Sequence, residues 1–138
     1  MMKYLRLILL LGLLVVGAQP VSAQKYRFKA SSLSIMDRDN KGQWSEWSAF
    51  KPADVVITLD GDKDRIVVHS KDLQLYRITA YYDKIANDNE ETLGFECLDN
   101  NGEMCVILLV TRKDEGGRMQ FYINYRDLKM VYNVYNSK

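Results

Sequence analysis

The sequence contains few of the residue types from which most catalytic and metal sites are built. It has one histidine and two cysteines among 138 residues. His69 has no cysteine or cluster of carboxylates beside it, whereas a zinc site of the usual kind needs three or four such ligands. Ser70 follows His69 directly, so in a strand the two side chains would point to opposite faces. We therefore expect a protein that is not an enzyme, with no catalytic residues, no metal and no cofactor.

An excess of charge of one sign is also lacking, because 19 lysines and arginines are matched by 18 aspartates and glutamates. Binding to nucleic acid requires a one-sided basic surface. The densest basic stretch is Lys25, Arg27 and Lys29, in alternation with aromatic residues. That pattern is typical of the solvated face of a strand. We expect no nucleic-acid partner.

Long apolar runs are absent except near the N-terminus. Residues 7–16 are apolar without interruption, which is about half of the ~20 residues needed to cross a bilayer as a helix. Two basic residues precede this run, and the small residues 21–23 follow it, as in a secretory signal peptide. We interpret residues 1–23 as a cleaved signal peptide and residues 24–138 as one domain. The mature chain is expected to have no membrane span and to be periplasmic or secreted.

The mature chain does contain a series of short runs in which apolar and polar residues alternate. Val55, Ile57 and Leu59, for example, would share one face of a strand. Clusters of aspartate, asparagine and glycine separate these runs and indicate turns. The predicted strands are residues 26–36, 55–59, 65–70, 73–82, 92–99, 104–111, 119–125 and 128–135.

About eight successive strands with mostly short links predict an all-β fold, an antiparallel meander. Such a meander can close into a small barrel, which removes the exposed edges of the sheet. A β-sandwich or an open curved sheet is the alternative. The strand at 104–111 is apolar on both faces, so its outer face needs a cover, for which segment 44–50 is the candidate. The polar segment 83–91 is expected to be the longest loop.

Cys97 and Cys105 flank the turn Asn100-Asn101-Gly102. A three-residue loop would place the two cysteines directly opposite each other on one face. A two-residue turn would shift the register by one residue and send them to opposite faces. Export to an oxidising compartment and the even number of cysteines favour a structural disulfide. Two buried thiols are the alternative.

Aromatic residues supply the candidate ligand contacts. Trp44 and Trp47 belong to the segment Trp-Ser-Glu-Trp-Ser, and they either pack against the barrel or form an exposed platform for a sugar or an apolar ligand. Tyr82 follows Tyr81 in the same strand, so one of the two lies at a surface or rim. Inward tyrosines of a barrel could also line a cavity with their hydroxyls. The candidate ligand-binding residues are Trp44, Trp47 and Tyr82.

The mature chain as a whole resembles small exported proteins of Gram-negative bacteria. The resemblance rests on the leader, the start Gln24-Lys25-Tyr26-Arg27-Phe28, the tryptophan pair, the cysteine hairpin and the final Tyr-x-Val-Tyr. It brings no assigned activity with it. A closed barrel would be lipocalin-like in architecture alone, because the Gly-x-Trp start of lipocalins is missing.

The expected function is that of an exported, non-enzymatic binding module for an apolar small molecule or a sugar. The alternative is a protein–protein interaction device, such as a hydrolase inhibitor or a subunit of an envelope complex. Its partner would then be an envelope or extracellular protein.

Overall fold

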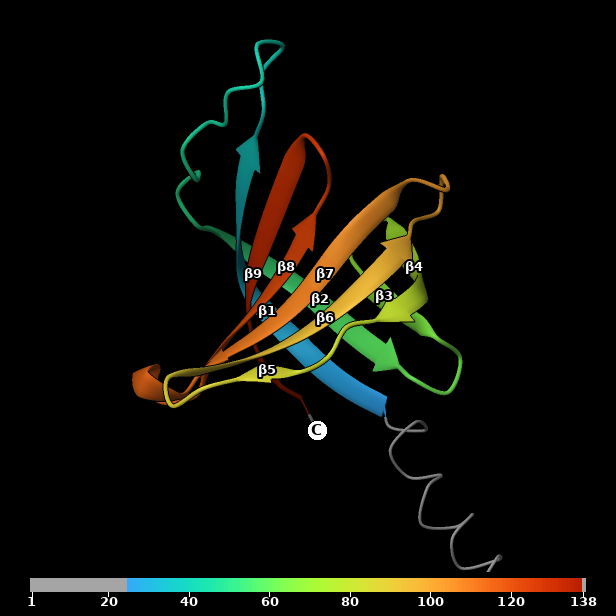
Figure 1. The fold of residues 1–138 in the computed structure, drawn as a ribbon, viewed down its shortest axis with the longest axis vertical. Coiled ribbons are helices and arrows are strands. Elements are labelled where there is room, and N and C mark those ends of the chain that lie inside the picture. Colours follow the sequence, from blue (N-terminus) through green and yellow to red (C-terminus); the bar gives the residue numbers. More distant parts are fainter. Residues whose placement is uncertain (1–24, 138) are drawn as a thin grey trace, which may run out of the picture.

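The computed structural model describes residues 25–137, and the regular secondary structure of this part of the chain is almost entirely β-strand (Figure 1). The expected signal peptide lies outside the described residues. One turn of 3-10 helix, Lys113–Glu115, follows the seventh strand. The strands are β1 (Lys25–Asp37), β2 (Lys51–Asp60), β3 (Arg65–His69), β4 (Leu73–Tyr81), β5 (Ile85–Ala86), β6 (Glu90–Leu98), β7 (Met104–Arg112), β8 (Arg118–Asn124) and β9 (Leu128–Asn136).

Eight of these strands form a closed antiparallel barrel. Neighbours along the chain pair with each other, β4 pairs with β6, and β1 pairs with β9 to complete the circle. The two-residue strand β5 adds to the lower part of β6. The predicted all-β meander and its closure are therefore confirmed, and the β-sandwich is excluded. The polar segment predicted as a loop contains β5, which was not predicted.

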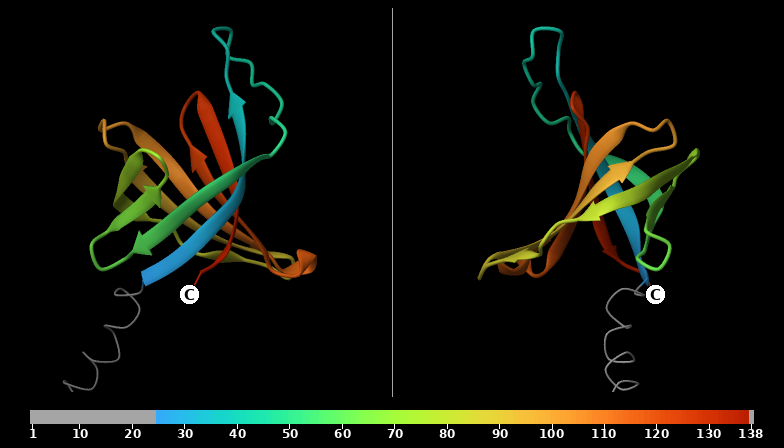
Figure 2. Two further views of the ribbon diagram at one scale, coloured as in Figure 1. Left: turned by 180° about the vertical axis from the view of Figure 1, so that it is seen from behind. Right: turned by 45° about the vertical axis from the view of Figure 1, so that its right-hand side comes forward.

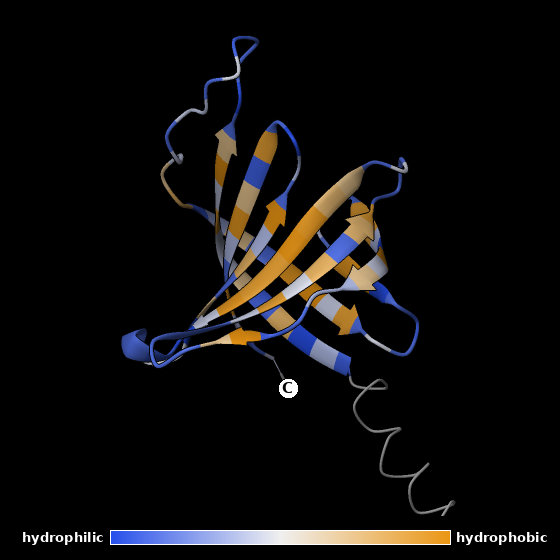
Figure 3. Cartoon of the chain, in the orientation of Figure 1, coloured by the Kyte–Doolittle hydropathy of each residue, from blue (hydrophilic) through white to orange (hydrophobic). Residues whose placement is uncertain are grey.

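Side chains fill the interior of the barrel. Inward and outward side chains alternate along the strands except at the irregularities in β1 and β4, and Phe28, Ile57, Ile66, Phe121 and Ile123 are at most 1% exposed. An eight-stranded barrel is just wide enough for such side chains. Figure 3 shows the alternation as bands along most strands, and β7 as a nearly continuous hydrophobic ribbon. The core explains the fold and leaves binding sites to the ends and the outer surface.

The two ends of the barrel differ. The end that we call the mouth carries the connections 38–50, 70–72, 99–103 and 125–127, and the opposite end carries 61–64, 82–89, 113–117 and both described termini. The connection between β1 and β2 is the longest, and it projects well beyond the mouth in all three views (Figures 1 and 2). The mouth is therefore the more irregular end.

The second half of this connection runs back along the upper part of β1. Ser45 N–H donates to the Asp37 carbonyl (2.8 Å) and Ser48 N–H donates to the Ile35 carbonyl (2.9 Å). The serine hydroxyls complete the pairing, because Asp37 N–H donates to Ser45 Oγ (3.1 Å) and Ile35 N–H to Ser48 Oγ (2.9 Å). The Trp-Ser-Glu-Trp-Ser segment thus provides the hydrogen bonds that a neighbouring strand would otherwise supply to the last residues of β1.

The turn between β6 and β7 has the three-residue geometry. Gly102 adopts a positive φ of 77°, and Cys97 lies directly opposite Cys105. The expected disulfide is nevertheless wrong, since both thiols are free and buried. Asp99 N–H donates to the Glu103 carbonyl (3.0 Å), so Asp99 and Glu103 form a hydrogen-bonded pair. Hydrogen-bonded and non-hydrogen-bonded pairs alternate along an antiparallel ladder, so the Cys97–Cys105 pair, two residues further on, is also of the hydrogen-bonded class. Cβ atoms in that class are ~5.5 Å apart, whereas a disulfide needs ~3.8 Å.

The burial of the two thiols predicts that they are chemically inert in the folded protein. Burial is the main cause that raises the pKa of Cys97 and of Cys105 to about 12, so almost no reactive thiolate is present near neutral pH. A disulfide reagent such as 5,5′-dithiobis(2-nitrobenzoate) should find no thiol in the native protein and two after denaturation without reductant. Finding none after denaturation would show that the bridge forms after all.

Candidate functional site

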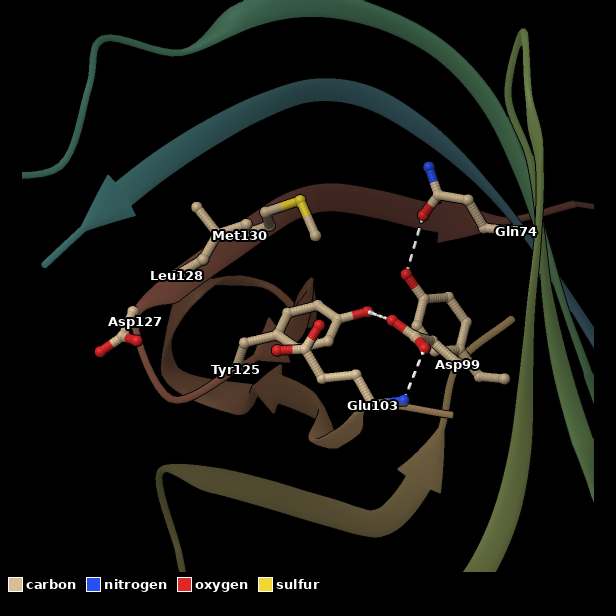
Figure 4. A pocket seen from close by; sticks show the side chains of 8 residues that line it. Gln74, Asp99, Glu103, Tyr125, Asp127, Leu128 and Met130 are labelled. Carbon is tan, nitrogen blue, oxygen red and sulfur yellow. Dashed lines mark hydrogen bonds between the residues drawn. The ribbon is translucent and has the colours of Figure 1, made fainter. Parts of the chain in front are cut away.

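A pocket of about 370 Å³ opens at the mouth of the barrel. It lies between the start of β4, the β6–β7 turn and the β8–β9 hairpin, whose side chains converge in Figure 4. Strands far apart in sequence therefore contribute to one site. The lining residues are Gln74, Tyr76, Asp99, Glu103, Tyr125, Asp127, Leu128 and Met130.

Two tyrosines that point inward form the polar base of this mouth pocket. Tyr76 is 2% exposed, and its hydroxyl donates to Gln74 Oε1 (2.8 Å). The hydroxyl of Tyr125 donates to Asp99 Oδ2 (2.7 Å), as Figure 4 shows. Because each hydroxyl proton is already in a hydrogen bond, to Gln74 or to Asp99, the two phenol oxygens can take part in further hydrogen bonds only as acceptors.

Asp99 connects the pocket to the β6–β7 turn. Its Oδ1 accepts the N–H groups of Asn101 and Glu103, both at 2.9 Å. Burial acts to raise the pKa of Asp99, but the hydrogen bond from Tyr125 and those from the backbone outweigh it and hold this pKa below its ordinary value. The Asp99 carboxylate is therefore ionised at neutral pH and fixed in orientation.

The remaining lining is acidic on one side and apolar on the other. Glu103 and Asp127 are exposed at the rim, and Asp127 pairs with Arg38 outside the lining (3.4 Å, Nε to Oδ1). Leu128 and Met130 form an apolar wall. None of the described residues that line the pocket is a lysine, arginine or histidine. The mouth pocket thus offers acceptors and negative charge, with the Gln74 amide as its side-chain donor.

A second pocket, of about 290 Å³, lies on the outer face of the barrel. Trp47 reaches it from the β1–β2 connection and lies edge-on to Tyr122, with ring centroids 6.3 Å apart. Leu108 and Val110 of β7, the strand that is apolar on both faces, line the same pocket as Trp47. The polar residues around it are Glu90, Thr92, Arg112, Asn124 and Lys129.

The three residues proposed from the sequence as ligand contacts lie outside the mouth pocket. Trp47 is 40% exposed in the outer pocket. Trp44 is half-buried, with Lys129 Nζ 4.7 Å and the Arg38 guanidinium carbon 5.5 Å from its ring centroid. Tyr82 is 47% exposed and packs against Gly94.

Sequence reasoning missed the mouth pocket as a set, although it expected inward tyrosines to line a cavity. Tyr76 is such an inward tyrosine, because it belongs to the buried core cluster. The signal that could have found Asp99 and Tyr125 is their place at two hairpin turns on the same end of a meander. His69 is exposed at the end of β3, and the described residues contain no cluster of three or more metal-ligating side chains.

Comparisons with protein-family models, curated proteins and solved structures gave no match. The function must therefore be argued from the geometry of the two pockets. Within residues 25–137, no helix is long and apolar enough to cross a membrane.

The buried tyrosines of the mouth pocket predict a loss of stability in alkali. Burial is the main cause that raises the pKa of Tyr76 to about 12 and the pKa of Tyr125 further above its ordinary value. In the unfolded chain both groups ionise near pH ~10. Between that pH and the folded-state pKa values the unfolded state binds fewer protons, so the free energy of unfolding should fall as pH rises.

Urea unfolding between pH 8 and 11 measures this effect. The decline should be shallower in Tyr125→Phe, which removes one of the titrating groups. Parallel curves for the wild type and Tyr125→Phe would contradict the assignment of the effect to this pocket.

Proposed function

We propose that this protein is an exported, non-enzymatic binding module that takes a small ligand in its mouth pocket. The observation that supports this function is the imbalance of the lining, in which acceptors and carboxylates face a space of about 370 Å³ without a cationic side chain. A ligand that enters must supply donors, because an acceptor that loses water without gaining a donor is destabilised. The ligand class that fits is a small organic cation.

The shape of the lining favours an ammonium group on a short aliphatic chain. The phenol oxygens of Tyr76 and Tyr125 and the carboxylate of Asp99 lie on the polar side of the pocket, and together they can accept the three protons of an ammonium group. Leu128 and Met130 provide an apolar wall for the chain. These polar groups and the apolar wall can bind a ligand without forming a covalent bond to it.

For this pocket we therefore propose an amine as the ligand, in place of the sugar or apolar molecule that the sequence led us to expect. Export remains part of the proposal, since it rests on the expected signal peptide. A small exported protein with such a pocket would bind its ligand outside the cytoplasm.

Pentylamine and 1-pentanol provide a matched pair of probes, because they share the chain and differ in the charged donor. Titration of the isotopically labelled protein should shift the backbone amide resonances of Asp99, Glu103 and Tyr125 with pentylamine and not with 1-pentanol. Equal shifts, or shifts confined to other residues, would refute the amine site.

Three variants sharpen this test. Tyr125→Phe removes an acceptor and the bond that orients Asp99, and it should weaken pentylamine binding about tenfold. Glu103→Gln removes an exposed charge without a hydrogen-bonded role, and its effect should be up to about fivefold. Asp83→Asn removes a charge at the opposite end of the barrel and should leave binding unchanged.

A protein–protein interaction device is the second candidate function. The observation that favours it is the projecting β1–β2 connection, on which Phe50 is exposed although it is a large apolar residue. The two functions differ in the titration described above. A device that acts only through this connection has no reason to distinguish pentylamine from 1-pentanol.

A further inference from the structure

The outer face of β6, β7, β8 and β9 carries a row of side chains that the mouth pocket does not use. Gly94, Leu108, Tyr122 and Val131 lie directly opposite one another across these four adjacent strands (Figure 1). Each follows or precedes a residue of the core cluster, so the row faces outward. Val131 and Gly94 are buried, and Leu108 and Tyr122 line the outer pocket. By register, Gly94, Leu108 and Tyr122 form one floor across three strands.

An aromatic ring lies at each end of this floor. At β8, Trp47 lies edge-on to Tyr122. At β6, Tyr82 covers Gly94, because a Cβ atom placed on Gly94 would lie 2.9 Å from Tyr82 Cδ2 and 3.2 Å from Leu108 Cδ2. The absence of a side chain at Gly94 therefore lets the Tyr82 ring lie close to the sheet. We call this floor, with Trp47 and Tyr82 at its ends, the outer trough.

Hydrogen-bonding side chains border the outer trough along both sides. The neighbouring outward row on one side contains Thr92, Gln120 and Asn133, and that on the other side contains Glu96, Asn124 and Lys129. Gln120 and Asn133 bond to each other, with Gln120 Nε2 3.2 Å from Asn133 Oδ1. Gln120 is buried and its amide is engaged by Arg112, Tyr122 and Asn133, so the accessible polar groups are Thr92 on that edge and the opposite row.

Charges of both signs surround the outer trough, and Lys129 lies over the Trp44 ring. Arg112 Nη1 lies 3.0 Å from Glu90 Oε2, and Arg112 Nε lies 3.6 Å from Glu115 Oε2 and donates to Gln120 Oε1 (3.0 Å). The carbonyl oxygen of the Asn124 side chain is buried without a partner in the described structure. A rotation of this amide would offer that acceptor to a ligand hydroxyl. The complementary ligand is neutral and carries both donors and acceptors.

We propose that the outer trough binds a neutral oligosaccharide that lies across β6, β7 and β8. A sugar ring has apolar C–H faces that stack on indole and phenol rings. Its hydroxyls lie at the rim and both donate and accept, as the bordering side chains require. Adjacent strands are ~4.8 Å apart, so the span from β6 to β8 is ~10 Å. A chain of several sugar units, rather than a monosaccharide, is needed to reach both Trp47 and Tyr82.

This site goes beyond the proposed function of the mouth pocket, because the two share no lining residue. The amine titration and the sugar test can therefore succeed or fail independently.

The test uses purified protein on an array of neutral glucose, mannose, galactose, xylose and N-acetylglucosamine oligomers from one to six units, followed by calorimetric titration of the best hexamer. We expect hexamer binding at least tenfold tighter than binding of the corresponding monomer. Trp47→Ala and Tyr82→Ala should each weaken the hexamer at least tenfold. Tyr135→Ala, which removes a similarly exposed tyrosine elsewhere on β9, and Tyr125→Phe in the mouth pocket should change it less than twofold.

Two further variants guard against unfolding as the cause of a loss. Trp47→Phe keeps an aromatic ring and should retain binding within about threefold. Gly94→Ala should displace the Tyr82 ring and weaken the hexamer as Tyr82→Ala does, although it removes no ligand contact. The proposal is overturned if no oligomer binds, if binding does not depend on Trp47 and Tyr82, or if monomer and hexamer bind equally. Capture of a protein partner through Trp47 without any sugar binding would also overturn it.

Discussion

The pairing of the first strand with the last is the constraint on which the rest of this structure depends. Without the β1–β9 ladder the eight long strands would form an open sheet with two unpaired edges. Closure fixes the circumference, and the interior of a barrel of this size is filled by side chains such as Phe28 and Phe121. A ligand therefore has no room at the centre. The sites that remain are the mouth, where core residues such as Tyr76 reach the end of the barrel, and the outer surface.

The mouth and the outer trough obtain their geometry in different ways. At the mouth, hairpin turns bring together side chains that lie at the ends of strands, and a hydrogen bond such as Tyr125 to Asp99 links two of these turns. On the outer face, strand register alone places Gly94, Leu108 and Tyr122 in one line. The long β1–β2 connection then adds Trp47 from above. The serine hydroxyls at Ser45 and Ser48 matter here because they hold that connection against β1.

Much of the fold could be predicted from the sequence, because period-two alternation reports directly which residues face a core. Val55, Ile57 and Leu59 were assigned to one face, and all three are buried. The cysteine register is one of the two that the turn residues allowed, since Gly102 can adopt a positive φ in either kind of turn. The disulfide could not be decided in this way. Whether opposite cysteines can bond depends on the class of their pair, which appears only in the hydrogen-bond pattern of the hairpin.

The candidate sites were less predictable than the fold. Trp47 and Tyr82 could be singled out because large aromatic residues near turns or rims are often exposed, yet nothing local to them shows that they lie at two ends of one row. That relation depends on β4, β6, β7 and β8 being neighbours in a set register. Asp99 looks like an ordinary turn residue in sequence. Its place beside Tyr125 becomes visible only when two separate hairpins meet at the same end of the barrel.

The β1–β9 ladder also has a consequence for how the chain acquires its shape. β1 begins at Lys25 and its partner strand ends at Asn136, so the circle is completed by contacts between residues that are 91 to 108 positions apart, from Asp37–Leu128 to Phe28–Asn136. Contacts of such large sequence separation form late and slowly. A growing chain has no last strand to offer, and its first strand must stay unpaired on one side until synthesis is finished. Under the export that we propose, such a delay would keep the chain open for threading through a narrow channel.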